Sequence, residues 1–179
     1  MGKDHGPGIK RSRETDRDKA LQEAVRWLAI RSRTELEVRR RLEDRGFPAD
    51  VIEDVMDKLN DLNYLNDQQF AERYVRNRLQ QKVGRIRIAM ELKQRGVEGE
   101  LLSAALEELE DGEEQEAAIA LARSRWREGE DPPRRRRRLF ALLMRRGFSR
   151  SVALKAIRAV QRERGERDPD GDEEPFIFS

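Results

Sequence analysis

Arginine is the side chain through which this sequence could do chemistry. Five arginines in succession, residues 134–138, lead into the apolar stretch 139–143. The guanidinium group presents a rigid fork of N–H donors that matches the oxygens of phosphate and carboxylate groups, so such a run favours an anionic partner. At a helix start the same charges oppose the helix dipole, which makes the run a poor choice for a merely solvated helix end. We interpret it as a binding surface; charge that serves only solubility is the alternative interpretation.

Residues for catalysis or metal binding are sparse. The chain has no cysteine, which removes disulfides, thiolate nucleophiles and thiolate-ligated metal sites. His5, the single histidine, stands among glycines and charged residues, where neither a catalytic base nor a metal site can be built around it. The sequence contains no glycine-rich phosphate loop and no Gly-x-Ser-x-Gly nucleophile motif. We therefore predict a protein that is not an enzyme, has no catalytic residue, metal or cofactor, and functions through its surfaces.

Composition limits the kind of fold. The chain has 179 residues, of which 41% are charged and 36% hydrophobic, and its mean hydropathy is −0.94. So few apolar residues do not support one large core, whereas small cores strung along a repeat need fewer of them. No apolar run approaches the ~20 residues of a membrane span, and no apolar signal-peptide core occurs. We expect a soluble cytoplasmic protein without membrane contact.

Charge is distributed unevenly along the chain. The formal net charge is only +2. Residues 111–162, however, hold 14 basic and 7 acidic side chains, a net charge of +7, and residues 163–179 hold 2 and 7, a net charge of −5. Such asymmetry indicates an anionic partner for one part of the molecule.

One sequence pattern occurs three times without gaps, at residues 38–59, 88–109 and 139–160. Each copy opens with two apolar residues four apart, which place an apolar stripe on a helix. A glycine follows four positions later (Gly46, Gly96 and Gly147) and suits the left-handed residue that ends a helix. Apolar residues then recur at i, i+1, i+4, i+5 and i+8, as in a second helix with a broad buried face. A period of about 50 residues with one such helix pair per copy is typical of α-helical repeat proteins.

A third, less regular helix precedes each copy. The first of these spans about residues 20–31, the second carries Phe70 and Tyr74, and the third carries Ile119 and Trp126.

Short polar residues mark several helix ends. Ser32 or Thr34 can cap the helix of the first copy, and Asn66 or Asp67 can cap the helix that carries Phe70. Asn63 is a plausible left-handed terminator.

The sequence thus predicts an all-α fold of three tandem three-helix repeats that form an elongated curved molecule. We expect a disordered leader at residues 1–18, the first repeat at 19–65, the second at 66–110, a basic third repeat at 111–162 and an acidic disordered tail at 163–179.

Several short motifs stand in the order and spacing of a known family. They are Tyr64-Leu65-Asn66-Asp67, Phe70-Ala71, Tyr74-Val75, Arg78, Gly84, Ile88, Leu92 and Gly96-Val97, with Thr34-Glu35-Leu36, Leu42 and Gly46 upstream. In these residues the chain resembles the RecX family of bacterial recombinase regulators, over roughly residues 20–160 and most strongly over 34–97. Asn63 stands where that family usually has a glycine. Asparagine is the next most tolerant residue for a left-handed backbone, so we expect the turn to persist.

The resemblance implies regulation of a protein filament. Members of this family are thought to lie in the groove of RecA filaments on single-stranded DNA and to inhibit strand exchange, ATP hydrolysis and LexA cleavage, in DNA repair and the SOS response. A modular repeat protein offers a surface that can touch successive subunits of a helical polymer. We therefore expect a monomer whose partner is the RecA filament, with direct DNA contact through the basic third repeat as a further expectation.

The residues expected to make these contacts are basic side chains that lie off the apolar stripes, where they would meet filament carboxylates or DNA phosphates. They are Arg40, Arg45, Arg85, Arg87, Arg95, Arg134, Arg135, Arg136, Arg137, Arg138, Arg145 and Arg146. The alternative is a stand-alone nucleic-acid-binding protein of tandem helical modules, in which a basic helix sits on a duplex. The near-neutral first two repeats count against this alternative, because they give a poor electrostatic footprint.

The segment 168–179 runs from acidic residues into Phe176, Ile177 and Phe178. Its composition predicts no fixed structure. Its tip resembles the acidic, Pro-Phe-containing tip of bacterial single-stranded-DNA-binding proteins. It can dock in a pocket of a partner or of the basic third repeat, or it can pack nowhere, and the sequence leaves these alternatives open.

Overall fold

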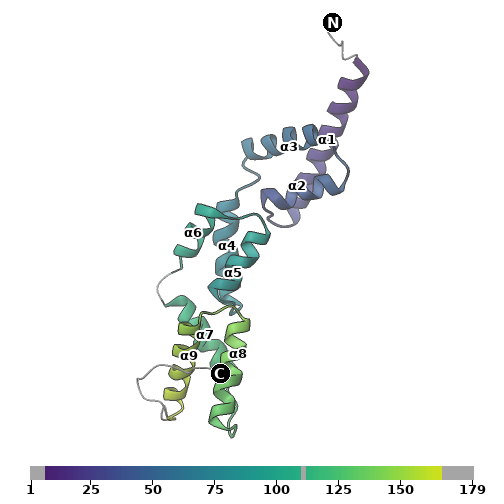
Figure 1. Cartoon of the computed structure of the whole chain (residues 1–179). Coiled ribbons are helices and arrows are strands. Elements are labelled where there is room, and N and C mark those ends of the chain that lie inside the picture. Colours follow the sequence, from purple (N-terminus) through teal and green to yellow (C-terminus); the bar gives the residue numbers. More distant parts are fainter. Residues whose placement is uncertain (1–6, 110–111, 167–179) are drawn as a thin grey trace. The chain divides into compact units, whose positions relative to one another are not determined.

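The computed structural model describes residues 7–109 and 112–166, and this part of the chain consists of helices without strands (Figure 1). The helices are α1 (Pro7–Ile30), α2 (Glu35–Asp44), α3 (Ala49–Asp61), α4 (Asp67–Gln80), α5 (Arg85–Gln94), α6 (Gly99–Glu107), α7 (Glu113–Ser124), α8 (Pro132–Arg145) and α9 (Arg150–Glu163). They occur in the predicted order, three for each repeat, so the predicted all-α class is confirmed. His5 and most of the predicted acidic tail lie outside the described residues.

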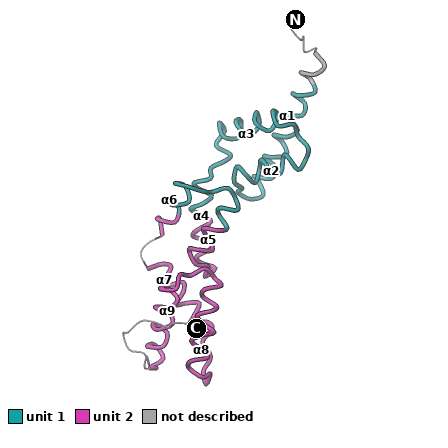
Figure 2. The backbone as a smooth tube through the Cα atoms, viewed as in Figure 1, with its two compact units in different colours: residues 1–73, 91–105 teal, residues 74–90, 106–179 magenta. Residues whose placement is uncertain are grey.

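The chain packs into two compact units (Figure 2). Unit 1 comprises residues 1–73 and 91–105, and unit 2 comprises residues 74–90 and 106–179. Helices α4, α5 and α6 of the second repeat therefore contribute residues to both units. The packing units cut across the repeats that the sequence displays.

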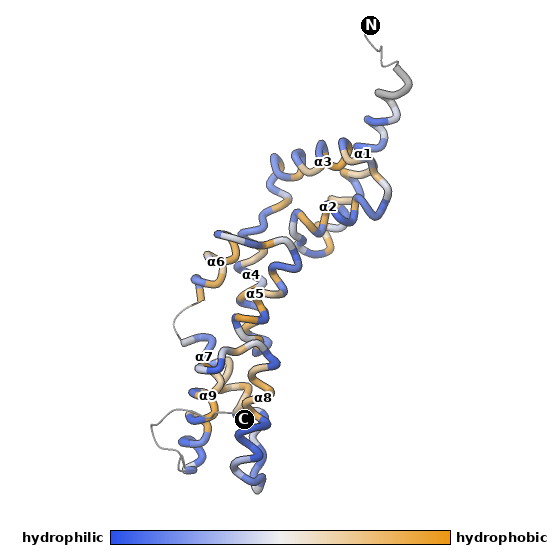
Figure 3. The backbone as a smooth tube through the Cα atoms, viewed as in Figure 1, coloured by the Kyte–Doolittle hydropathy of each residue, from blue (hydrophilic) through white to orange (hydrophobic). Residues whose placement is uncertain are grey.

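The core of unit 1 is built by α1, α2 and α3. The second-helix pattern of the first copy places Val51, Ile52, Val55, Met56 and Leu59 on one face of α3, and all five are buried. They pack with buried residues of the two other helices, namely Ala20, Ala24, Trp27, Val38 and Leu42. Each helix buries only a stripe, and hydrophilic residues follow hydrophobic ones along the tube in Figure 3.

The core of unit 2 follows the same rule in α7, α8 and α9. Leu139 and Leu143 of α8 are fully buried, as is Phe148, the residue after the glycine turn. They meet the buried stripes of the neighbouring helices, namely Ala118, Leu121, Ala122, Ala153, Ala156, Ile157 and Val160.

Helix α1 begins earlier than the sequence suggested. We predicted a disordered leader at residues 1–18 and a helix from about residue 20, whereas α1 starts at Pro7, so residues 7–18 are helical. Proline suits a first helical turn, and neither glycine nor proline interrupts residues 9–30. Arg13 also forms ion pairs with Asp50 and Asp54 of α3, at 3.1 Å each. These pairs are exposed and contribute little individually, so continuation of the packed helix accounts for most of the extension.

The predicted turns are confirmed. Gly46, Gly96 and Gly147 have φ values of +82°, +88° and +85°, and Asn63 has a φ of +55°. At the first glycine, the Phe47 N–H donates to the Leu42 carbonyl over 3.3 Å, the closing bond of a left-handed helix cap. The same bond recurs after Gly96 and Gly147, so the three copies end their first helix in one way.

The turns at Gly96 and Gly147 also contact the start of a helix that comes earlier in the chain, α2 and α5 respectively. We call each of these contacts a repeat joint. In unit 1 the Thr34 hydroxyl donates to the Arg95 carbonyl over 2.7 Å. In unit 2 the Gly84 N–H donates to the Arg146 carbonyl over 2.8 Å. Positions 34 and 84 correspond in the repeat, as do 95 and 146, so one contact is made twice.

A carboxylate from the following repeat completes each repeat joint. The Glu35 N–H donates to Asp67 over 3.0 Å, and the Arg85 N–H donates to Glu114 over 2.8 Å. Burial raises the pKa of Asp67 above the ordinary aspartate range; the bond from the Glu35 N–H opposes this, and the charges of Glu35 and Glu37 add to it.

Hydrogen bonds decide between the two residues that the sequence offered as N-cap for α2 and for α4. Of the two candidates for α2, Thr34 is the cap and accepts from the Glu37 N–H over 3.2 Å. Asn66 caps α4 by accepting from the Gln69 N–H over 2.8 Å, which leaves Asp67 to the repeat joint.

Alanine substitutions at the glycine turns should separate backbone strain from the repeat joint. A Cβ at Gly46 would meet nothing within 4 Å, whereas one at Gly147 would lie 2.6 Å from the Arg87 nitrogen. Gly46→Ala should therefore cost only the left-handed strain, about 1 kcal/mol, and Gly147→Ala roughly 1–3 kcal/mol more because the repeat joint must open. Urea unfolding of both variants measures this, and equal losses would contradict the repeat joint as described.

Substitution of Asp67 should separate its hydrogen bond from its charge. Because its pKa is raised in the folded state, ionisation lowers stability as pH rises from the ordinary aspartate pKa through the folded one. Asp67→Asn keeps the acceptor oxygen and should melt no lower than the parent at pH 7, with any gain vanishing at acid pH. Asp67→Ala should lose about 1 kcal/mol at either pH, since the Glu35 N–H loses its acceptor. If the asparagine variant melts as low as the alanine variant at pH 7, the charge is needed and this account is wrong.

Candidate functional site in the third repeat

The start of α8 fixes how the arginine run is presented. Asp131 caps the helix, with its carboxylate accepting from the Arg134 N–H over 3.1 Å, and prolines occupy the first helical positions. The five arginines then fill more than one turn of a helix with 3.6 residues per turn. Consecutive residues on such a helix point in all directions, so the run cannot present a single face.

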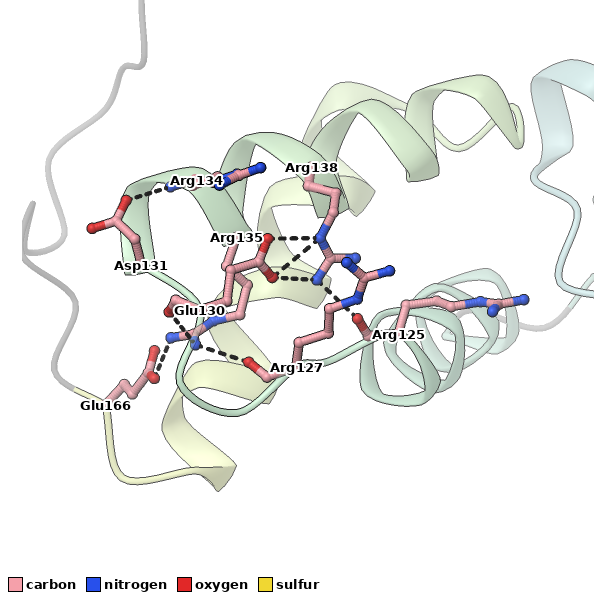
Figure 4. A network of polar contacts seen from close by, with 8 residues as sticks. All are labelled: Arg125, Arg127, Glu130, Asp131, Arg134, Arg135, Arg138 and Glu166. Carbon is pink, nitrogen blue, oxygen red and sulfur yellow. Dashed lines mark hydrogen bonds and ion pairs between the residues drawn. The ribbon is translucent and has the colours of Figure 1, made fainter.

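Arg135 points inward. Its side chain is 3% exposed and donates to the Arg127 carbonyl over 3.2 Å and to the Glu130 carbonyl over 2.9 Å. It also pairs with Glu166 (Figure 4). Its guanidinium carbon lies 4.1 Å from the centre of the Trp126 ring. A buried charge needs this degree of pairing. We expected Arg135 to contact a partner; instead it fastens the loop between α7 and α8.

Arg138 has a similar structural task. Its guanidinium donates to the Glu130 carboxylate over 2.7–3.2 Å and to the Arg125 carbonyl over 3.0 Å (Figure 4). The hydrogen bond from Arg138 lowers the pKa of Glu130, and the charges of Arg138, Arg127 and Arg134 act in the same direction. Arg138 therefore also holds the loop, as Arg135 does.

The three remaining arginines of the run differ in exposure. Arg134 and Arg137 are exposed, and Arg136 is half-buried. Arg136 and Arg137 line a hollow between α8 and α9, which we call the arginine hollow. Its lining comprises Arg136, Arg137, Phe140, Arg150, Leu154, Ile157, Arg158 and Gln161.

The sequence prediction missed Arg150 and Arg158. Both lie on α9, on the side that faces α8, together with Leu154 and Gln161 of the same lining. Arg150, Leu154 and Arg158 follow one another at intervals of four residues, which places them on one face of a helix. This spacing is the sequence signal that could have predicted the two arginines as site residues. The apolar pattern of α9 by itself indicates only the buried stripe of that helix.

Three of the predicted arginines outside α8 serve the fold of unit 1 or lie on its surface. Arg40 is exposed on α2. Arg45 pairs with Glu23 over 3.3 Å. Arg95 pairs with Glu37 and lies 5.9 Å over the ring of Phe70.

In unit 2 the other four cluster at the second repeat joint. Arg85 pairs with Glu114 over 3.7 Å, and Arg87 donates to the Arg145 carbonyl over 3.3 Å. Arg145 is exposed and Arg146 is half-buried. The structure thus gathers only Arg136 and Arg137 of the predicted set in the arginine hollow.

The third repeat lacks the geometry of a further repeat joint. Helix α8 starts at Pro132, one turn earlier relative to its glycine than α2 or α5. Position 135 corresponds to Thr34 and Gly84, the residues that donate to the next repeat, and here it is occupied by the inward arginine. In the third repeat this position therefore fastens the α7–α8 loop of its own repeat.

In the described ranges, no group of three or more His, Cys, Asp or Glu side chains could hold a metal ion. No helix in that part of the chain is both long and apolar enough to cross a membrane.

Comparison with known proteins places the three repeats in one family. Its models match in tandem: the first three-helix domain of RecX at residues 20–59, the second at 66–106 and the third at 112–157. The regulatory protein RecX of Mycolicibacterium smegmatis is 34% identical over 160 residues, covering 84% of this chain and 85% of the relative. That of Deinococcus radiodurans is 35% identical over 157 residues, covering 86% and 74%.

Solved structures agree with these sequence matches. The crystal structure of RecX from Lactobacillus salivarius superposes with a TM-score of 0.74 at 25% identity, covering 83% of this chain and 98% of that one. A second crystal structure of regulatory protein RecX shares the fold, with a TM-score of 0.75 at 24% identity over 89% of this chain and 79% of that one. The chain belongs to the RecX family of regulatory proteins.

Proposed function

We propose that this protein binds RecA filaments on single-stranded DNA and restrains their recombinase, ATPase and LexA co-protease activities, in DNA repair and the SOS response. The observation that carries the proposal is the tandem match of all three RecX domains along the chain. Curated relatives that match most of this chain are named regulatory proteins. The protein acts as a cytoplasmic monomer, without cofactor or membrane, and by binding rather than by catalysis.

The arginines of α8 and α9 are the contacts that we assign to the partner. Arg134 and Arg137 are exposed, and Arg150 adds a third exposed guanidinium on the neighbouring helix. Arginine pairs in a bidentate manner with carboxylates of a protein surface and with DNA phosphates, so both components of a filament are suitable. Arg135 and Arg138 leave the contact set, because their guanidinium groups hold the α7–α8 loop.

The three predicted arginines in unit 1 are placed differently. Arg95 and Arg45 have carboxylate partners within the fold, and we assign them to stability. Arg40 remains a proposed contact on α2, as do Arg145 and Arg146 at the C-terminal end of α8. Arg85 and Arg87 mainly serve the second repeat joint.

A stand-alone nucleic-acid-binding protein is the second candidate function. The net charge of +7 over residues 111–162 favours it, since phosphate contacts dominate affinity for nucleic acids. Binding to bare and to RecA-coated single-stranded DNA should be compared over a salt series. Pure phosphate binding loses about 0.7 log units of affinity per log unit of salt for each neutralised phosphate of a single strand. A filament regulator should favour the coated DNA and lose less, because protein contacts remain.

The decisive measurement is DNA-dependent ATP hydrolysis by RecA of the same organism, titrated with this protein. We expect inhibition by the parent protein. Arg134→Glu/Arg137→Glu should raise the half-inhibitory concentration roughly fivefold to thirtyfold, because exposed ion pairs contribute up to ~1 kcal/mol each. Arg26→Glu/Arg76→Glu is the matched control: it makes the same charge change at exposed positions of α1 and α4 and should leave inhibition almost unchanged.

Three outcomes of this titration differ in meaning. Absence of inhibition by the parent protein at saturation would overturn the proposed function. Equal effects of the two double variants would remove the third repeat as the contact surface while leaving the function intact. Inhibition at substoichiometric amounts would favour capping of filament ends, and inhibition only near saturation would favour binding along the groove.

A further inference from the structure

The arginine hollow combines positive charge with an apolar floor. Four arginines surround Phe140, Leu154 and Ile157, and the described residues of the lining include no carboxylate. In the described part of α9 and the residues after it, Glu163 pairs with Arg123 over 2.6 Å, and Glu166 pairs with Arg135. The hollow is therefore suited to a ligand that presents both carboxylates and apolar side chains.

The size of the hollow excludes a bulky small molecule. Its enclosed volume is about 20 Å³, close to that of a single water-sized probe, whereas cofactor pockets run to hundreds of Å³. An occupant must lie across the hollow and insert no more than parts of its side chains. An extended peptide meets this requirement.

One segment of this chain has the required chemistry. Residues 172–178 read Asp-Glu-Glu-Pro-Phe-Ile-Phe, three carboxylates followed by a proline and three large apolar residues. The charge of the segment 163–179, −5, is opposite to the +7 of residues 111–162. In this segment the carboxylates come first and the apolar residues follow. The carboxylates can therefore pair with arginines at the edge of the hollow while the phenylalanine rings cover its apolar floor.

The length of chain after α9 allows this docking. Ten residues separate Glu166 from Phe176, which corresponds to a reach of roughly 33 Å when extended. The hollow follows α9 from Gln161 back to Arg150, a distance of roughly 17 Å along the helix axis. A tether of this length also gives an effective concentration in the millimolar range, so that even weak docking is well populated.

We propose that residues 172–178 dock in the arginine hollow of their own chain, with Phe176 and Phe178 over the apolar floor and the carboxylates paired with the arginines. Docking is independent of the proposed function. Its consequence rests on that function: the tail covers part of the arginine surface and competes with the anionic partner, so the protein is partly self-inhibited until a partner displaces the tail.

Docking is tested without RecA or DNA, with a fluorescent peptide of residues 168–179 and the full chain. Phe176→Ser/Phe178→Ser in the protein empties the hollow and should raise peptide affinity at least tenfold over the parent. Adding Arg137→Glu/Arg150→Glu should remove that gain. Arg134→Glu/Arg145→Glu, an equal charge change at exposed α8 positions outside the lining, should largely keep it.

A control peptide with both phenylalanines changed to serine should bind at least tenfold more weakly. If the peptide binds the parent and the emptied variant equally, or if Arg137→Glu/Arg150→Glu has no more effect than its control, the docking proposal is overturned. Circular dichroism checks that each variant folds. All four substituted arginines are exposed, so we expect the variants to keep the fold, and a loss of peptide binding then reports on the hollow.

The consequence is tested in the RecA ATPase titration. Phe176→Ser/Phe178→Ser should lower the half-inhibitory concentration severalfold. Docking in the peptide assay with unchanged inhibition would refute self-inhibition alone. No inhibition by either protein would refute the proposed function and leave the docking result standing.

Discussion

The fold depends on the contact between a left-handed glycine turn and the start of an earlier helix. Gly96 and Gly147 adopt φ values near +85°, and each also lies so close to that helix that a Cβ would collide with it. The carbonyl before each glycine accepts the hydrogen bond from Thr34 or Gly84. Glycine thus both ends one helix and makes room for the neighbouring helix, which explains how the helices of a chain with few apolar residues are held without a large common core.

Much of this fold could be predicted from local sequence patterns. The apolar stripe of α3, the three glycine turns and Asn63 follow from periodicity and from backbone sterics, which act over a few residues. The repeat joint could not be predicted in this way, because Thr34 and Arg95 are 61 residues apart and the bond joins a side chain to a carbonyl. The early start of α1 was missed for a different reason: residues 7–18 lack an apolar stripe, and the helix simply continues outward from its packed part.

The site was less predictable than the fold. A run of arginines reveals charge, but which guanidinium groups face solvent depends on helix phase and on the path of the preceding loop. Arg135 points inward because Glu130, Glu166 and Trp126 come together only after the loop and α9 have folded. Conversely, Arg150 and Arg158 join Arg136 and Arg137 only through the pairing of two helices. Tertiary packing therefore removed some predicted contacts and supplied others.

The arginines that hold the α7–α8 loop and the arginines at the surface of the third repeat are linked through the nearby carboxylates. Five positive charges at a helix start oppose the dipole and repel each other, so the run needs nearby carboxylates to be tolerated. Glu130, Asp131 and Glu166 meet this need at Arg135, Arg138 and the cap of α8. None of these three carboxylates belongs to the described lining of the arginine hollow. The described lining of the hollow between α8 and α9 combines four arginines with no carboxylate, and this composition favours an anionic ligand there.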